Sequence, residues 1–284
     1  MNRPALTVLA LAVATVGGCF SGNAAYMTPE RLDRGLVVIL PGIEGVSTTN
    51  LRIRRAIDDG GVDRSLQIWS WGWPVPLVGM AMNQMDFLGN YLNAHAVARR
   101  IMTYQDEYPG RPVHIIGQSG GGGIAIMSAQ ALPADRQIDG VILLSASMSS
   151  AYDVTKALKR SRSGIVNYYN PNDAILLVAT TVLGNVDGIH GPSAGLIGFD
   201  EPGQSASDER KEAYRKLYQI RLTSLMVAGR NGSHFSTSRY DFISRYVAPL
   251  LLDSDWQIVA HARRPADLVG PAPKPHRFQL TSGP

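Results

Sequence analysis

Six short apolar segments recur along the chain, each bounded by turn residues. They are predicted to be strands and cover Gly35–Leu40, Leu66–Trp71, Pro112–Ile116, Asp139–Ser145, Gly164–Tyr169 and Arg221–Ala228. Within runs such as LVVIL and GVILL the apolar residues are consecutive rather than alternating. That pattern is typical of strands that are buried on both faces of a sheet.

Helical patterns lie between these segments. Asn83–Tyr108 places Phe87, Leu88, Tyr91 and Leu92, among others, at spacings of three and four residues, and Asp208–Gln219 has the composition of a solvated, charged helix. Strands that alternate with helices predict an α/β domain whose sheet is covered on both sides. We therefore expect a mostly parallel sheet of about six strands, flanked by helices.

Composition narrows the class of protein. Of 284 residues, 45% are hydrophobic and 18% are charged, so the chain can build a core and does not resemble a disordered protein. The net charge of +4 is scattered and gives no nucleic-acid signature. One cysteine excludes a disulfide framework, and the dispersed histidines without an HExxH motif give no sign of a metal site. We expect no cofactor.

The first residues resemble an export signal. Arg3 precedes an apolar run from Pro4 to Val16, which is too short to span a membrane, and Gly17-Gly18-Cys19 then resembles a bacterial lipobox. The alternative is an ordinary secretory signal followed by a buried cysteine. We expect residues 1–18 to be removed, Cys19 to be lipidated, 19–34 to be a linker, 35–263 to form the domain and the proline-rich 264–284 to be a tail.

The most specific motif is Gly117-Gln118-Ser119-Gly120-Gly121, which directly follows a predicted buried strand and precedes a run of small residues. A serine on a sharp strand-to-helix turn needs glycine two residues before and two after, because side chains there would collide with neighbouring backbone. A tight structural turn or a phosphate-binding loop could also contain such glycines. The absence of a lysine after the glycines argues against a P-loop.

In this context the motif resembles that of the α/β-hydrolase superfamily, and the resemblance covers about residues 35–250. It implies a serine nucleophile at Ser119 and the chain order serine, acid, histidine. His234 follows the last predicted strand, where the family places its base, and His190 is the reserve. For the acid we choose Asp173, in the turn after Gly164–Tyr169; Asp153 is the alternative.

Two further carboxylates, Asp187 and Asp200, are weaker candidates for the acid, and each aspartate could instead serve as a turn or capping residue. The resemblance also implies an oxyanion hole made by two backbone amides, those of Gly120 and Ile43. In the segment Pro41-Gly42-Ile43, proline stands where the family often has histidine. This departure removes a side-chain hydrogen bond that often braces the loop.

Two segments border the expected site. Trp69, Trp71 and Trp73 would share one face if their strand continued, as part of an acyl pocket, a membrane-facing rim or the core. The short distance from Ser145 to Asp173 leaves no room for a large cap domain. A stretch with six glycines between residues 184 and 203 is expected at the mouth of the site or as a plain surface loop.

These observations favour a lipid-anchored serine hydrolase at the cell envelope, facing an extracytoplasmic compartment and acting on a small-molecule or lipid ester. A peptidase or thioesterase would use the same residues. An inactive binding protein on a hydrolase fold is the alternative from another functional class.

Overall fold

A computed structural model describes residues 22–72, 78–227, 233–256 and 259. The expected signal peptide, Cys19, Trp73 and the C-terminal tail lie outside these described residues. The rest of the chain is built around one sheet, as the apolar segments predict.

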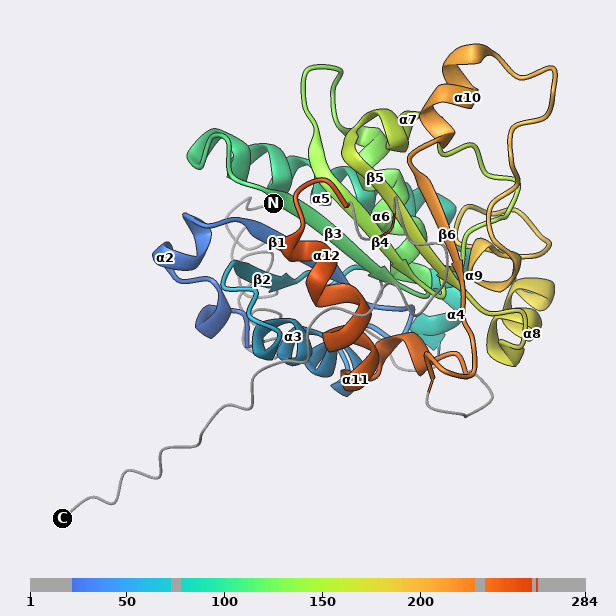
Figure 1. The fold of residues 1–284 in the computed structure, drawn as a ribbon. Helices are drawn as coiled ribbons and strands as arrows, with labels where there is room; N and C mark the ends of the chain where they lie inside the picture. Colours follow the sequence, from blue (N-terminus) through green and yellow to red (C-terminus); the bar gives the residue numbers. More distant parts are fainter. Residues whose placement is uncertain (1–21, 73–77, 228–232, 257–258, 260–284) are drawn as a thin grey trace, which may run out of the picture.

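The sheet has six strands, all parallel, in the order β2-β1-β3-β4-β5-β6 (Figure 1). The strands are β1 Leu36–Leu40, β2 Ser65–Ile68, β3 Val113–Gln118, β4 Ile138–Leu144, β5 Ser161–Tyr169 and β6 Leu217–Arg221. The predicted fold class, an α/β sheet of about six parallel strands flanked by helices and without a large cap, is confirmed.

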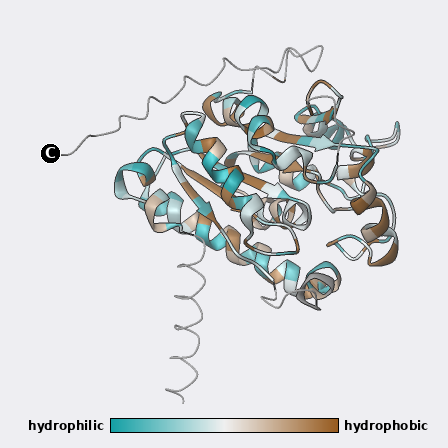
Figure 2. Cartoon of the chain, turned by 90° about the horizontal axis from the view of Figure 1, so that it is seen from below, coloured by the Kyte–Doolittle hydropathy of each residue, from teal (hydrophilic) through white to brown (hydrophobic). Residues whose placement is uncertain are grey.

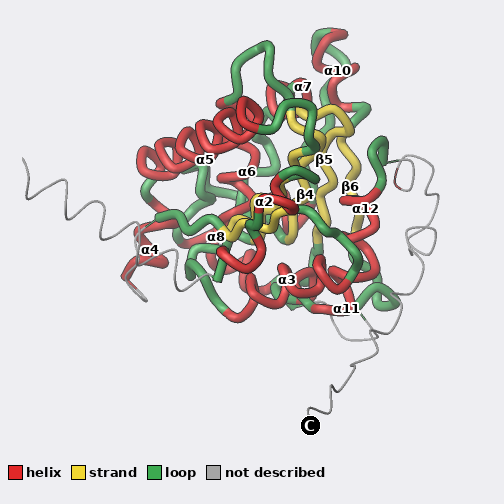
Figure 3. Tube along the Cα trace, turned by 90° about the vertical axis from the view of Figure 1, so that its left-hand side faces the viewer, coloured by secondary structure: helices red, strands yellow, loops and turns green. Residues whose placement is uncertain are grey.

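Helices cover both faces of the sheet, as the tube in Figure 3 shows. One face is covered by α5 Phe87–Glu107, α6 Gly120–Ala131, α7 Thr155–Lys159 and α10 Asp208–Tyr214, and the other by α3 Thr48–Asp59, α11 Tyr240–Phe242, η3 Ile243–Val247 and α12 Ala248–Leu252. The remaining elements are η1 Ala24–Tyr26, α2 Pro29–Leu32, α4 Val78–Met85, α8 Ala174–Val182, α9 Ala194–Ile197 and η2 Ser236–Ser238.

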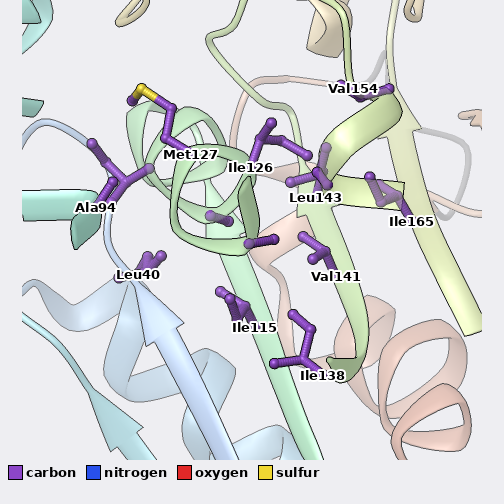
Figure 4. Packing of buried hydrophobic residues seen from close by; sticks show 14 of the residues in the cluster. Leu40, Ala94, Ile115, Ile126, Met127, Ile138, Val141, Leu143, Val154 and Ile165 are labelled. Carbon is purple, nitrogen blue, oxygen red and sulfur yellow. The ribbon is translucent and has the colours of Figure 1, made fainter. Parts of the chain in front are cut away.

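Successive strand residues enter different cores, which explains the unbroken apolar runs. In β1, Leu36, Val38 and Leu40 pack with α5 and α6, whereas Val37 and Ile39 pack with α3 and the C-terminal helices. Figure 4 shows the first of these cores, with residues such as Ile115 of β3 and Val141 of β4 beneath α6. Burial of both faces removes apolar area from water at ~25 cal/mol per Å² and fixes the strands.

The prediction for the last strand is wrong. Arg221–Ala228 overlaps β6 by one residue, and the predicted helix Asp208–Gln219 ends at Tyr214, so its last residues belong to β6. β6 is an edge strand and needs only half-buried side chains such as Tyr218 and Ile220. The apolar run that followed forms a turn, in which Leu225 is 83% exposed.

The predicted helix Asn83–Tyr108 is two helices. Asp86 accepts a hydrogen bond from the backbone N–H of Gly89 at 2.8 Å and thereby caps the start of α5. In the first turns of α5 the apolar residues of the periodic pattern, Phe87, Leu88, Tyr91 and Leu92, are exposed. The helix is buried instead through smaller residues further along, such as Ala94 and Val97.

The segment before β1, expected as a linker, contacts the sheet edge. The side-chain amide of Asn23 donates to the carbonyl of Ile68 at 2.9 Å and its oxygen accepts from the Ile68 N–H at 3.0 Å. Ile68 is the last residue of β2. The described chain therefore begins against the carboxyl end of this edge strand.

His114, expected to pack in the sheet, lies buried in β3 with its ring centroid 6.3 Å from that of Trp256. Burial, together with the positive charges of Arg64 and Arg162, lowers its pKa to about 3. The imidazole is therefore neutral in the folded chain at physiological pH.

Substitution of His114 should change how stability depends on pH. Between its unfolded pKa of 6.5 and its folded pKa of about 3, the unfolded chain binds a proton that the folded chain does not. The free energy of unfolding should therefore fall as the pH drops below 6.5, with a contribution approaching ~1.4 kcal/mol per pH unit. Denaturant titrations from pH 4 to pH 8 should show this slope reduced in His114→Leu.

The matched control is Ile115→Val on the same strand. It should lower the free energy of unfolding by ~1 kcal/mol at every pH without altering the slope. An unchanged slope in His114→Leu would contradict the assigned cause.

Candidate active site

Ser119 occupies a strained turn between β3 and α6. Its φ of 53° and ψ of −122° are unusual for a residue with a side chain. The turn is held from both sides: the Ser119 N–H donates to the carbonyl of Leu144 at 2.9 Å, and the Ser119 carbonyl accepts from the N–H groups of Gly122 and Ser147, each at 2.9 Å. This is the geometry expected of a nucleophile elbow.

The flanking glycines are required by close backbone packing. A Cβ atom at Gly117 would collide with the backbone of Gly121 and Gly122, and one at Gly121 would collide with the carbonyls of Leu40 and Pro41. The physical reason for the motif is thus present at both glycines. The same packing brings the first turn of α6 against the loop that follows β1.

His234 and Asp173, 61 residues apart in sequence, lie together. The distance from His234 Nδ1 to Asp173 Oδ2 is 2.8 Å, and both side chains are buried. Asp173 Oδ1 accepts from the N–H of Leu176 at 3.0 Å and caps α8. Asp173 therefore has the capping role that aspartates commonly have and, with its other oxygen, orients an imidazole.

The loop that carries His234 is anchored to β4. Ser236 Oγ accepts from the Ser233 N–H at 2.8 Å, and Thr237 Oγ1 lies 3.3 Å from Ser145 Oγ at the end of β4. His234 follows the last strand, as expected, although that strand is β6 and ends at Arg221. These contacts place the imidazole at the carboxyl edge of the sheet, where Ser119 also lies.

Because Asp173 contacts His234 through Nδ1, the other ring nitrogen, Nε2, is the one that could accept the proton of Ser119. Among the described residues, no hydrogen bond joins this nitrogen to Ser119 Oγ. Bonds of this kind are often long in ligand-free enzymes and shorten when substrate binds.

The alternative candidates lie in other environments. His190 is exposed, and so is Asp200. Asp153 accepts from the N–H of Thr155 at 2.9 Å and pairs with Arg210, which is the role of a turn residue. Asp187 accepts from the Ser149 N–H at 3.2 Å, and burial raises its pKa.

Ile43 and Gly120, the predicted oxyanion donors, lie side by side. A Cβ atom at Gly120 would lie 2.6 Å from Ile43 Cγ2, so the Ile43 side chain packs directly against the Gly120 backbone. The Trp71 ring would lie 3.3 Å from the same Cβ atom. Trp71 is buried and, because β2 ends at Ile68, it is not in a strand that continues to Trp73.

Three side chains brace the loop after β1, a role that the sequence analysis did not predict for them. Gln118 Oε1 accepts from the Gly42 N–H at 2.9 Å, Trp71 Nε1 donates to the Pro41 carbonyl at 2.8 Å, and Asn83 Nδ2 donates to the Ile43 carbonyl at 2.9 Å. They replace the hydrogen bond that Pro41 cannot make. Gln118 lies inside the Gly117–Gly121 motif, and its side chain was the sequence feature that could have indicated a brace for this loop.

Glu44 adds a second carboxyl group near the site. Burial raises its pKa, while its own backbone amide and the charge of His234 act in the opposite direction. Its Oε1 is buried without a hydrogen-bond partner.

The glycine-rich segment covers the first turns of α6. The Val186 N–H donates to the Ser147 carbonyl at 3.3 Å, and a Cβ atom at Gly123 would collide with Val186. Gln84 Nε2 donates to Ser147 Oγ at 2.8 Å and to the Gly184 carbonyl at 2.5 Å. This segment and α4 together border the site.

A surface hollow lies away from the site, and the described residues form neither a metal cluster nor a membrane-spanning helix. A surface hollow of about 510 Å³ next to α10 is lined by residues such as Glu201 and Lys211 and holds none of the candidate residues. In the described part of the chain, no group of three or more His, Cys, Asp or Glu side chains is arranged to bind a metal, and no helix there is long and apolar enough to cross a bilayer.

Comparison with known proteins identifies no family. No protein-family model and no curated protein matches the chain. Among solved structures, the chain is similar to "RedJ with PEG molecule bound in the active site", at 12% identity and a TM-score of 0.34, over 69% of this chain and 81% of that one. A likeness at that level supports no assignment of function.

Removal of the Gln118 side chain tests the bracing of the loop after β1. If that loop supplies an oxyanion donor, Gln118→Ala should lower kcat for a soluble ester by ~10-fold or more with little change in KM, because the donor acts in the transition state. Steady-state kinetics would measure this. Gln137→Ala, which removes an exposed glutamine that donates to Lys159, is the control. A loss confined to KM would contradict the role.

Proposed function

We propose that this chain is a serine hydrolase that cleaves carboxylic esters through an acyl-enzyme on Ser119. The observation that carries the proposal is the buried 2.8 Å contact between His234 Nδ1 and Asp173 Oδ2, at the same sheet edge as the strained turn of Ser119. A serine hydroxyl is a weak nucleophile until a base takes its proton, and the base needs a partner that fixes its tautomer.

In the proposed reaction, Ser119 Oγ attacks the ester carbonyl carbon while its proton passes to His234 Nε2. Asp173 holds the Nδ1–H and stabilises the imidazolium ion. The backbone amides of Ile43 and Gly120 would donate to the oxyanion. His234 then returns the proton to the departing alcohol, and water, deprotonated by the same histidine, releases the acid from Ser119.

We propose further that the protein resides at the cell envelope and is attached to a membrane by a lipid on Cys19. The support is the sequence Val16-Gly17-Gly18-Cys19 after a short apolar run. The substrate would be a small-molecule or lipid ester. A peptidase or thioesterase would need the same groups, and a panel of substrates separates these possibilities.

Labelling with a fluorophosphonate tests the nucleophile. The reagent phosphonylates only activated serines, so the intact chain should be labelled and both Ser119→Ala and His234→Ala should lose at least ~99% of the labelling rate, since removal of a triad member costs about 10⁴-fold or more in rate. In-gel fluorescence would measure it.

The control is Ser128→Ala, because Ser128 is a buried serine on α6 whose hydroxyl donates to the Ile124 carbonyl at 2.7 Å. This variant should be labelled as the intact chain is. If the folded chain stays unlabelled, the inactive binding protein becomes the better description.

Metabolic labelling with an alkynyl fatty acid tests the anchor. In a bacterial host the exported chain should incorporate the label and Cys19→Ala should not, because the sulfur is the acylation point. Incorporation of label into Cys19→Ala, or a soluble unlabelled wild-type chain, would contradict the anchor.

A further inference from the structure

A band of exposed apolar side chains borders the proposed site. It is called the apolar rim here and includes Met85, Phe87, Leu88, Leu177, Val178 and Val182, whose exposed fractions lie between 50% and 68%. Single exposed apolar residues are normal on a soluble protein, but a contiguous group of large ones marks an interaction surface.

Helix α8 has the reverse of the usual surface pattern. A helix on the surface normally turns its polar side outward. In α8, with the sequence AILLVATTV, only Leu176 and Thr180 are buried, while the leucine and valine side chains at 177, 178 and 182 face solvent. The hydrophobic effect opposes this arrangement unless another apolar phase covers the helix.

The two parts of the apolar rim are joined. Gln84 of α4 donates to the carbonyl of Gly184, two residues after the end of α8, at 2.5 Å. A Cβ atom at Gly188 would lie 3.8 Å from Phe87 Cβ. In Figure 1, α4 and α8 lie near the arrowhead ends of the strands, and Figure 2 shows brown, hydrophobic helix at this end of the molecule.

Charge is nearly absent from the rim elements. Residues 174–199 contain one acidic residue, Asp187, and no lysine or arginine, and residues 78–98 contain only Asp86. Asp86 caps α5 and Asp187 is buried, so neither charge belongs to the outer surface of the apolar rim. A protein partner is usually met by a polar border with hydrogen bonds. The hydrocarbon region of a bilayer, in contrast, excludes charged groups and forms no hydrogen bonds with a protein surface.

The position of the apolar rim links it to the site and to the start of the described chain. Asp173, the partner of His234, caps α8, so the exposed face of α8 begins at the site. Asn23 is bonded to Ile68 at the carboxyl end of β2. Cys19 precedes Asn23 by four residues, which span at most ~14 Å, so only a short stretch of chain separates a lipid on Cys19 from this end of the sheet.

We propose that the apolar rim docks the Ser119 site directly onto a lipid surface, inserting the exposed side chains of α4, α5 and α8 into the acyl-chain region. The inference rests on the proposed function, since it takes the Ser119 site as the feature that docking serves. It assigns to the membrane a contact beyond the Cys19 lipid. Ester groups at the lipid surface would then meet the site without first leaving the bilayer.

Sedimentation with vesicles of uncharged phosphatidylcholine tests the docking in the chain from residue 19 with Cys19→Ser, which keeps every described residue and lacks the lipid. This chain should bind the vesicles. Leu88→Glu combined with Val178→Glu should lower the partition coefficient by roughly tenfold or more, because charge is excluded from hydrocarbon. Leu252→Glu in α12, at a leucine that is 54% exposed and lies away from the site, should leave binding within about twofold.

Further measurements distinguish failure of the docking proposal from failure of the catalytic proposal. Ser119→Ala should keep vesicle binding while losing fluorophosphonate labelling, so failure of the catalytic proposal is recognised independently of docking. Thermal unfolding would verify that the double variant is folded. Absence of vesicle binding, or equal loss in Leu252→Glu, would overturn the proposal. So would a dimer, measured by light scattering, that the double variant converts to a monomer, because the apolar rim would then join two copies of the chain.

Discussion

The tight crossing of backbone at Ser119 determines the rest of the site. With no side chains at Gly117 and Gly121, α6 begins against the carbonyls of Leu40 and Pro41. This contact fixes the loop after β1 relative to the serine, and Ile43 comes to lie against Gly120. The strain of a positive φ at Ser119 is maintained by hydrogen bonds to Leu144 and from Ser147, both from the neighbouring strand and its loop.

A second constraint is the sharing of one carboxylate between two tasks. Asp173 Oδ1 is held by the N-terminus of α8 and Oδ2 by His234. The helix amide of Leu176 fixes the rotamer of the carboxylate, so the imidazole meets a partner that is already oriented. The same capping contact starts α8 at the site and so determines where its exposed apolar face lies.

The sequence predicted what depends on local pattern and failed where the environment decides. Runs such as Leu36–Leu40 are buried on both faces, so consecutive apolar residues identify them. The edge strand Leu217–Arg221 has one half-exposed face and follows a charged helix without a glycine between them, so its pattern resembles the end of that helix. The predicted fold class was still correct, because misplacing the last strand did not change the number of strands.

Among the candidate site residues, too, those set by local pattern could be predicted and those that depend on contacts between distant segments could not. The glycines around Ser119 are dictated by backbone collisions that any sequence with this turn must avoid. Asp173 and His234 were chosen because the α/β-hydrolase resemblance implies an acid and a histidine after later strands. The braces of the oxyanion loop were missed because Gln118, Trp71 and Asn83 come from different segments and meet only in three dimensions.

The exposed residues of α5 belong to the periodic pattern that predicted the helix. Helical periodicity shows that a face is apolar, but it does not show what covers that face. In α5 the sheet covers only the part that begins at Ala94. The turns before it carry large exposed apolar side chains, and Phe87 lies near Gly188, in the segment that follows α8. An apolar face that the described residues leave exposed is accounted for, in our proposal, by a lipid surface, and its start at Asp173 places that surface beside the proposed catalytic groups.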